Sequence, residues 1–122
     1  MQEYKVTVDA SGIIRFYKPG AYVLHRLDGP AVEYANGAKL WYQDGKCHRT
    51  DGPAVEWANG AKSWYQNGKL HRTDGHAVEE ADGDKHWYQN GKHHRIDGPA
   101  VERADGTVEY YITGERLTLA LS

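Results

Sequence analysis

The chain has 122 residues, with 15 Lys or Arg against 17 Asp or Glu, which gives a formal net charge of −2. That balance excludes a protein drawn to nucleic acid or to an anionic membrane by its overall charge. A mean hydropathy of −0.80 excludes a thick two-layer core, and no apolar run reaches the length of about 18 residues expected of a membrane-spanning helix.

Two further features bear on the cellular compartment. Cys47 is the only cysteine, so no disulfide can form within the chain. The first eight residues contain neither a basic segment nor an apolar stretch of the kind that signal peptides carry. We therefore expect a cytoplasmic protein with no targeting segment and no membrane partner.

Residues 1–24 are expected to form a degenerate capping hairpin. Phe16 and Tyr17 stand where later copies have an aromatic pair, and two extra residues follow before Leu24. The end units of repeat arrays are usually atypical, because one side of each faces water.

Residues 25–116 consist of four successive copies of one 23-residue unit. The copies at 25–47 and 48–70 differ at five positions, while those at 71–93 and 94–116 diverge further but keep the spacing. Repetition at this period is typical of a solenoid, in which each unit buries apolar surface mainly against its neighbours.

Each copy contains two short extended runs joined by a turn. In the second copy, residues 54–58 and 61–66 flank Asn59 and Gly60, a pair that favours a two-residue type I′ turn. The equivalent pairs are Asn36-Gly37, Asp82-Gly83 and Asp105-Gly106. A second turn follows each aromatic pair, at Asp44-Gly45, Asn67-Gly68, Asn90-Gly91 and Thr113-Gly114.

A two-residue turn would pair Ala58 with Ala61 and thereby fix which side chains share a face. One face would carry Val55, Trp57, Lys62 and Trp64, and the other Ala54, Glu56, Ala58, Ser63 and Tyr65. The Val and Trp of successive copies would then form one seam, with the Tyr side chains in a ladder on the opposite face. A bulge would exchange the faces, and this alternative stays open at the level of sequence.

Residues 117–122 alternate apolar and polar side chains, which predicts a closing strand, with a short helix as the alternative. Leu117, Leu119 and Leu121 would lie along an edge that can pair with another chain. Residues 1–122 are therefore expected to form one all-β domain, a single-layer antiparallel meander of stacked hairpins with about ten strands.

The aromatic-rich hairpin followed by Gly-Lys-x-His and a second glycine, at residues 64–75 and again leading into 77–83, resembles the MORN (membrane occupation and recognition nexus) repeat. It looks closest to MORN-like repeats of bacteria and tailed phages that carry His-Arg-x-Asp-Gly-Pro-Ala. The resemblance covers almost the whole chain. It implies a single-layer stack of hairpins that serves as an interaction scaffold, and it implies no catalytic residues.

One histidine recurs in each copy, at His25, His48, His71 and His94. Successive copies should lie roughly 10 Å apart, whereas Zn–N bonds measure about 2.0–2.1 Å, so one ion cannot join successive copies. His93 with His94 and His86 is a local exception, but no Cys or acidic set completes a shell. We therefore predict no metal site, no cofactor and no catalytic residues.

One arginine also recurs in each copy, two residues before an aspartate. The four are Arg26, Arg49, Arg72 and Arg95. In one interpretation the carboxylate fixes the guanidinium within a structural loop; in the other, the arginines form a ladder that binds phosphates. The repeated Asp and Glu residues cancel most of the positive field, which argues against nucleic acid.

Two columns of residues vary while their surroundings repeat. The first is Tyr34, Trp57, Glu80 and Arg103, and the second is Leu40, Ser63, His86 and Glu109. Such positions reflect either drift on a solvent-facing surface or a binding surface that is aromatic at its start and charged at its end. The protein-binding residues we predict are Tyr34, Trp57, Leu40, Glu80, His86 and Arg103.

Together these patterns favour a non-catalytic protein-interaction module. We expect a small bacterial or phage accessory protein that docks on a host protein, with inhibition as one expected consequence. Two alternatives stay open: a nucleotide or nucleic-acid binder that uses the Arg and His ladder, and a purely structural module that forms a homodimer through its C-terminal edge.

Overall fold

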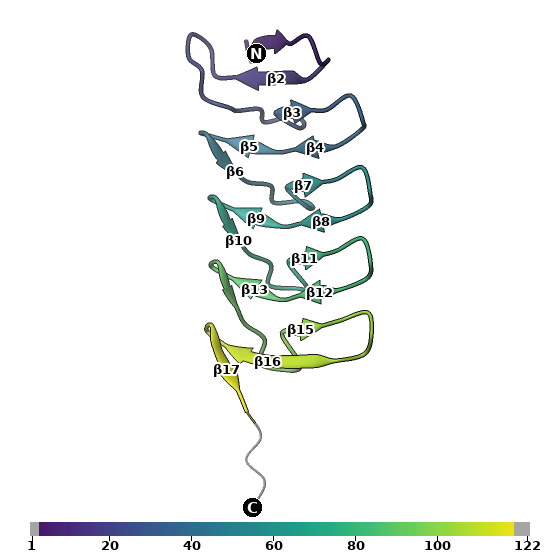
Figure 1. Ribbon diagram of the computed structural model, residues 1–122. Coiled ribbons are helices and arrows are strands. Elements are labelled where there is room, and N and C mark those ends of the chain that lie inside the picture. Colours follow the sequence, from purple (N-terminus) through teal and green to yellow (C-terminus); the bar gives the residue numbers. More distant parts are fainter. Residues whose placement is uncertain (1–2, 119–122) are drawn as a thin grey trace, which may run out of the picture.

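The computed structural model describes residues 3–118, and every regular element in that range is a β-strand. Eleven of the strands form one antiparallel sheet in which spatial order follows chain order (Figure 1). They are β1 (Lys5–Val8), β2 (Ile14–Tyr17), β3 (Val32–Glu33), β4 (Lys39–Leu40), β7 (Val55–Glu56), β8 (Lys62–Ser63), β11 (Val78–Glu79), β12 (Lys85–His86), β15 (Val101–Glu102), β16 (Val108–Ile112) and β17 (Glu115–Leu117).

Three small ribbons extend the inner copies beyond this sheet. They pair β5 (Tyr42–Gln43) with β6 (Lys46–Cys47), β9 (Tyr65–Gln66) with β10 (Lys69–Leu70), and β13 (Tyr88–Gln89) with β14 (Lys92–His93). The predicted single-layer meander of hairpins is confirmed. The described residues contain 17 strands rather than about ten, because each long strand is split and a further short strand follows the second turn.

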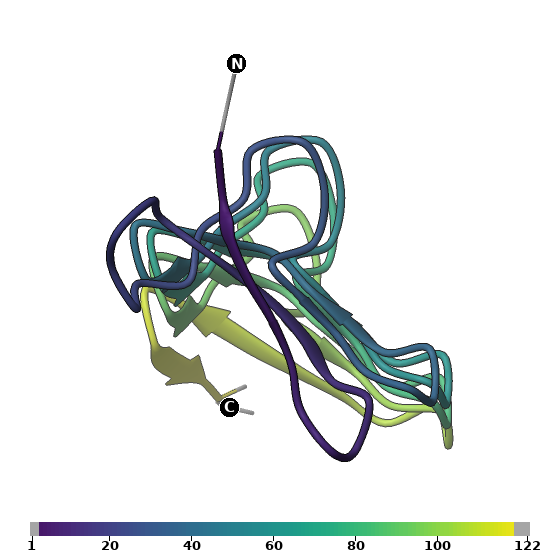
Figure 2. The ribbon, with the colours of Figure 1, turned by 90° about the horizontal axis from the view of Figure 1, so that it is seen from above.

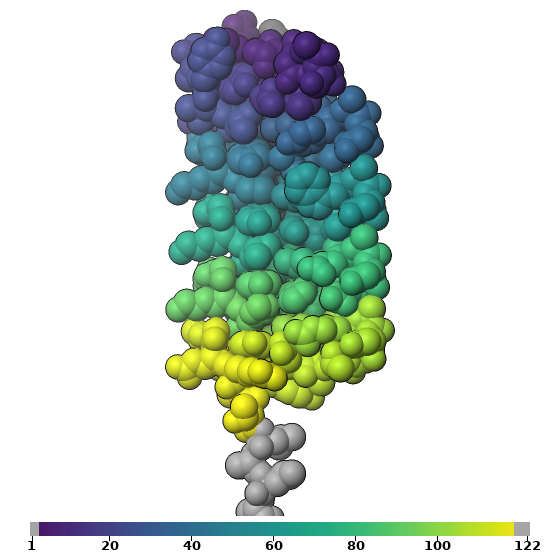
Figure 3. Space-filling view, viewed as in Figure 1, coloured from purple at the N-terminus to yellow at the C-terminus, as the bar shows by residue number. Residues whose placement is uncertain are grey.

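The copies stack with little rotation between them. Viewed along the stack, their turns and loops lie nearly on top of one another (Figure 2). Viewed from the side, they form successive layers from the N-terminal to the C-terminal end (Figure 3). The same residue of each copy therefore falls in one column along the molecule.

The first turn of each copy is a three-residue loop, and the predicted two-residue type I′ turn is wrong there. Trp57 N donates to Ala61 O at 2.9 Å, and Gly60 N donates to Trp57 O at 3.0 Å. Gly60 has a φ of +94°, whereas Asn59 is not among the residues with positive φ. Asn59 contributes its side chain instead: Oδ1 accepts a hydrogen bond from Ala61 N at 3.0 Å, as Asx turns do.

This loop shifts the register by one residue and exchanges the two faces. Val55 lies opposite Ser63 and Glu56 lies opposite Lys62. One face of the second copy consequently carries Val55, Trp57, Ser63 and Tyr65, and the other carries Ala54, Glu56, Lys62 and Trp64. The predicted seam of Val with Trp is therefore wrong, and it is the Tyr column that accompanies the valines.

The second turn has the type I′ geometry that the first lacks. In the second copy Gln66 pairs with Lys69 around Asn67 and Gly68, whose φ values are +51° and +82°. Both central residues of the second turn also have positive φ in the other three copies, including Thr113 with a φ of +48°. Both central residues of a type I′ turn require positive φ, which Asn, Asp and Gly adopt most easily.

The N-terminal segment forms a fifth hairpin on the same pattern. Phe16 N donates to Ala31 O at 2.7 Å, as Trp41 N donates to Ala54 O at 2.7 Å one copy later. Its second turn is longer, since Lys18 N donates to Val23 O across four intervening residues, which reflects the two extra residues in the sequence.

The core is thin and consists of small side chains. Among the described residues the buried apolar ones are mainly one alanine per copy, at 0 % exposure, and valines. They are Ala31, Val32, Ala38, Ala54, Val55, Ala77, Ala100 and Val101. The Trp and Tyr columns that flank this core are mostly half-buried, so the aromatic rings cover the core rather than form its centre.

At the C-terminal end, Tyr110 takes the Trp position and is 44 % exposed, because no further copy covers it. Of the predicted closing strand, Leu117 lies in β17 and is 51 % exposed. Leu119 and Leu121 lie outside the described residues, as does the predicted pairing that depends on them.

Candidate binding surfaces

The arginine of each copy is held within its own loop. In the second copy, Arg49 Nε donates to Asp51 Oδ1 at 2.9 Å, and Nη1 donates to Pro53 O and to Glu56 Oε2, each at 3.0 Å. The hydrogen bond from Arg49 lowers the pKa of Asp51. The same Arg-Asp pair occurs in all four copies at 2.9 to 3.0 Å.

Each guanidinium also lies over the aromatic ring of the preceding copy. Arg49 lies 3.9 Å from the ring centroid of Trp41, and Arg72 lies 4.1 Å from that of Trp64. Arg26 makes the same contact with Phe16 at 3.9 Å. These cation–π contacts join neighbouring copies, so the repeated arginines and tryptophans form an inter-copy structure.

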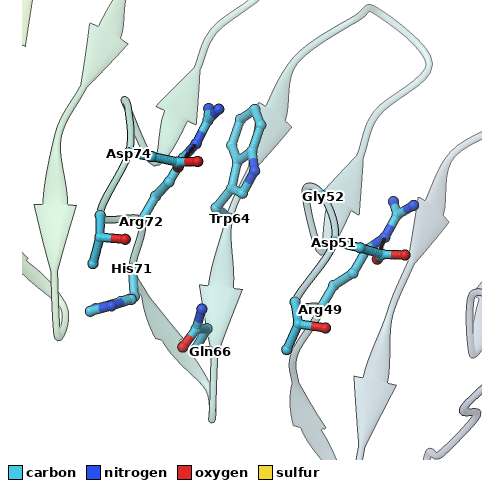
Figure 4. A pocket seen from close by; sticks show the side chains of 10 residues that line it. Arg49, Asp51, Gly52, Trp64, Gln66, His71, Arg72 and Asp74 are labelled. Carbon is cyan, nitrogen blue, oxygen red and sulfur yellow. Dashed lines mark hydrogen bonds and ion pairs between the residues drawn. The ribbon is translucent and has the colours of Figure 1, made fainter.

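A shallow polar groove lies between each pair of successive loops. The groove between the second and third copies has a volume of about 410 Å³. Figure 4 shows Trp64 and Arg72 along one side of it and Arg49 with Asp51 along the other. Each arginine in it has an aspartate within 3.0 Å, so the groove presents paired charges rather than a basic stripe.

The repeated histidines also make hydrogen bonds that stabilise the fold. His48 Nδ1 accepts a hydrogen bond from Asn67 N at 3.0 Å, and the equivalent contacts elsewhere measure 2.9 to 3.0 Å. Each therefore supports the second turn of its own copy. Only the unprotonated nitrogen of a histidine can accept in this way, and His94, adjacent to His93, makes this turn contact with Thr113 N.

The opposite surface gathers the residues that vary between copies, and we name it the variable face. It carries both varying columns predicted from the sequence, the Tyr column, and the column that precedes each repeated histidine. Its members are Tyr34, Trp57, Glu80 and Arg103; Leu40, Ser63, His86 and Glu109; Tyr42, Tyr65, Tyr88 and Tyr111; and Cys47, Leu70, His93 and Arg116.

The first two copies make this face largely apolar. Trp57 is 47 % exposed, while Tyr34 and Leu40 are half-buried. Cys47 is half-buried beside them, and burial raises the pKa of its thiol to about 11. A thiol with that pKa is protonated at neutral pH, so Cys47 lacks the thiolate that a nucleophile needs.

The third copy replaces these apolar residues with titratable ones. His93 lies between the rings of Tyr88 and Tyr111, with centroid distances of 4.2 and 4.8 Å. His86 Nδ1 lies 3.3 Å from His93 Nε2. Burial, and secondarily the charge of His86, lower the pKa of His93. Glu80, Asp84 and His86 each bring one ligand atom within 4.8 Å of the others.

The fourth copy ends the face with charges that pair among themselves. Arg103 Nη2 lies 3.0 Å from Glu109 Oε2, and Arg116 Nη2 lies 3.5 Å from Glu109 Oε1. Glu109 is thus shared between two guanidiniums, and the C-terminal part of the face is highly polar.

The structure places all six predicted protein-binding residues on the variable face and the four arginines on the other. Sequence reasoning missed Asp84 and did not associate Glu80 with the histidines. The signal that could have found them is the three-residue turn, which sets Glu80 directly across the hairpin from Asp84: Glu80 N donates to Asp84 O at 2.8 Å.

Comparisons with known proteins identify no family for this chain: no protein-family model matches it, and no curated protein matches it. Within residues 3–118 there is no helix of the length and apolarity that crossing a membrane requires.

Proposed function

We propose that this chain is a non-catalytic module that binds a protein through the variable face. The observation that carries the proposal is the position of the two varying columns. They differ in all four copies, including the first two, which are otherwise nearly identical, and they lie side by side on one open surface, with Trp57 47 % exposed. The other face repeats its Arg, Asp and Trp residues with few changes because the fold uses them, and its varying loop column is Leu27, Thr50, Thr73 and Ile96.

The chemistry of the variable face suits a protein partner. Exposed aromatic side chains are frequent among the residues that dominate protein interfaces, because they bury a large area at little cost in conformational entropy. Tyr34, Leu40 and Trp57 provide such a patch at the N-terminal half of the face. Glu80, His86 and Arg103 supply polar contacts and charge selectivity farther along.

Two alternatives receive less support. Phosphate binding by the arginine ladder would require free guanidiniums, whereas each of the four is bonded to an aspartate and lies over an aromatic ring. Self-association through the C-terminal edge depends on Leu119 and Leu121, which lie outside the described residues.

The family and setting belong to the same proposal. The stack of hairpins is consistent with a MORN-like repeat, and the bacterial or phage setting, with an inhibitory role, follows from that resemblance alone. A cytoplasmic location is supported by Cys47 being the only cysteine.

The experiment begins with capture of partners from bacterial lysate on the immobilised full chain, followed by mass spectrometry. The affinity of the purified partner is then compared between the wild type and a chain with Tyr34→Ala and Trp57→Ala. We expect binding to weaken by about 30-fold or more, as loss of interface anchors does.

Ile96→Ala is the matched control, because Ile96 is an apolar side chain that is 82 % exposed in a loop of the arginine face. It should leave the affinity unchanged. If the double variant binds every specific partner as tightly as the wild type does, the proposed site is wrong. Any activity of the partner is assayed with and without the chain to test inhibition.

A further inference from the structure

We propose that the third copy contains a binding site for a transition-metal ion of the zinc type, formed by His86 and His93 together with Glu80 and Asp84. The site does not depend on the proposed protein-binding function. The argument rests on the distances within this cluster, on what fixes each side chain, and on the absence of the same set from the other copies.

The two histidines already have the separation of two ligands of one ion. Nδ1 of His86 and Nε2 of His93 lie 3.3 Å apart. Two nitrogens bound to zinc at about 2.0–2.1 Å in tetrahedral geometry lie about 3.3 Å from each other. When the ion is absent, a hydrogen bond between the rings holds them at this distance, and metal binding requires only that the shared proton leave the contact.

His93 is held rigidly in the orientation that the site needs. Its ring lies between Tyr88 and Tyr111, at centroid distances of 4.2 and 4.8 Å, and its plane is inclined by 30° and 28° to theirs. A ligand that is already immobilised loses little conformational entropy when an ion binds. These tyrosines recur in every copy, so the structural support for such a ligand is present throughout the stack.

The carboxylates complete the donor set. Glu80 Oε1 lies 3.9 Å from His86 Nε2, the ring nitrogen that does not face His93. The side chain of Glu80 is 50 % exposed, so it is free to turn toward Nδ1 of His86 and join an ion held between the histidines. Asp84 belongs to the same group of ligand atoms, and its Oδ1 is fixed by a hydrogen bond from Ala104 N at 2.7 Å. Bonds of this kind orient carboxylate ligands in metal sites.

The donor types select the metal. Imidazole nitrogens with carboxylate oxygens suit zinc, nickel, copper and cobalt, whereas calcium and magnesium prefer oxygen ligands alone. The site lies on an open face, which leaves room for water or for a group of another molecule in the remaining coordination positions.

The other copies lack this set at the same four positions. The second copy has Trp57, Ala61, Ser63 and Leu70, and the fourth has Arg103, Thr107, Glu109 and Arg116. Only the third copy combines two histidines with two carboxylates, so the inference predicts one ion per chain.

The test uses the full chain, produced without a histidine tag and freed of metal by dialysis against a chelator. Zinc chloride is titrated in by calorimetry, and bound zinc is counted by elemental analysis after dialysis. We expect one zinc ion per chain, no displacement by millimolar magnesium, and a rise in the melting temperature with added zinc. Binding below 0.1 zinc ion per chain would overturn the proposal.

Single variants identify the ligands. His86→Gln and His93→Gln should each weaken zinc binding by at least about 100-fold, since even loss of a group that only orients a ligand costs about 10 to 100-fold. His76→Gln, which alters a histidine outside the cluster, should leave the affinity unchanged. Thermal melts without zinc establish that each variant is folded.

If His93→Gln unfolds because His93 packs between two tyrosines, the decision rests on His86→Gln and on Glu80→Gln, since the side chain of Glu80 is 50 % exposed. Zinc binding that is unchanged in His86→Gln and in Glu80→Gln would place the ion elsewhere and refute the site.

Discussion

The arginine of each loop contributes more to the fold than its ion pair with aspartate suggests. Asp51 is 82 % exposed in its side chain, so its attraction to Arg49 is weakened by water. Arg49 is only 22 % exposed, and it also donates to Pro53 O and lies 3.9 Å from the ring of Trp41. The planar guanidinium can make these contacts together, which an ammonium group cannot.

Arg49→Lys should therefore lower the free energy of unfolding by about 1–3 kcal/mol, through the lost hydrogen bond to Pro53 and the lost stacking on Trp41. Urea denaturation followed by tryptophan fluorescence measures this change. Asp51→Asn should be clearly less destabilising. An equal loss for the two variants would show that the ion pair itself is the main contribution.

His76 should make the fold sensitive to pH. It replaces the proline of the other copies and lies between the rings of Trp64 and Trp87, at centroid distances of 5.8 and 5.4 Å. Burial lowers its pKa in the folded state, although Glu79, at 3.5 Å, acts in the opposite direction, and Arg72 and Lys85 add to the lowering.

Because the folded state takes up this proton less readily than the unfolded chain does, the contribution of His76 is fully present above a pH of about 6.5. It declines as the pH falls through that value toward the lower folded pKa. His76→Pro removes the effect, so the free energy of unfolding of the wild type relative to this variant should fall as the pH is lowered from 7.5 to 5. A constant difference across that range in urea denaturation would disprove the assignment.

Sequence prediction gave the position of both turns of each copy but the wrong type for the first. Asn-Gly and Asp-Gly occur at both turns, yet the first is a three-residue loop and the second a type I′ turn. The pair suits both: Asn59 accepts a hydrogen bond through its side chain, whereas Asn67 adopts positive φ. The local sequence does not separate the two uses, because the pairing of the flanking strands decides between them.

That single ambiguity explains why the side chains were assigned to the wrong faces. A shift of one residue moves every side chain of a strand to the other face. The repeat period, the hairpins and the two varying columns could be predicted, because they depend on spacing alone. The contact of Glu80 with Asp84 could not, because it requires the correct register of the first turn. The sequence does group His86 with His93, whose contact depends on the second turn rather than on that register.

Thr113 offers a direct test of the second turn. Its φ of +48° is unfavourable for a β-branched residue, and the other copies have Asn or Asp at this position. Thr113→Asn should raise the free energy of unfolding by about 0.5–1 kcal/mol. Thr73→Asn, at a loop residue outside the positive-φ region, should change it little. A decrease in stability for Thr113→Asn in thermal denaturation would contradict the turn geometry.

At the scale of the whole molecule, each copy contacts mainly its neighbours through the same set of bonds. The junctions repeat: Trp41 N donates to Ala54 O at 2.7 Å, and Trp64 N donates to Ala77 O at 2.7 Å. Stability in such arrays is approximately a sum over units and interfaces. One copy can therefore be removed without changing the kinds of contact at the new junction.

Deletion of residues 48–70 should leave a folded, shorter stack, in which Cys47 is followed directly by His71. Its circular dichroism per residue should match that of the full chain, with a lower free energy of unfolding and a smaller dependence on urea concentration, since less surface is exposed on unfolding. Loss of cooperative unfolding would mean that the copies are not interchangeable units.

Two tryptophans of one copy distinguish the face that stabilises the stack from the variable face. Trp57 is 47 % exposed on the variable face, whereas Trp64 is half-buried on the other face beneath Arg72. The decisive measurement is the free energy of unfolding of Trp57→Ala and Trp64→Ala by urea denaturation. We predict a loss of about 1 kcal/mol or less for Trp57→Ala and of about 2–4 kcal/mol for Trp64→Ala. Equal losses, or a larger one for Trp57→Ala, would show that the two faces do not differ in this way.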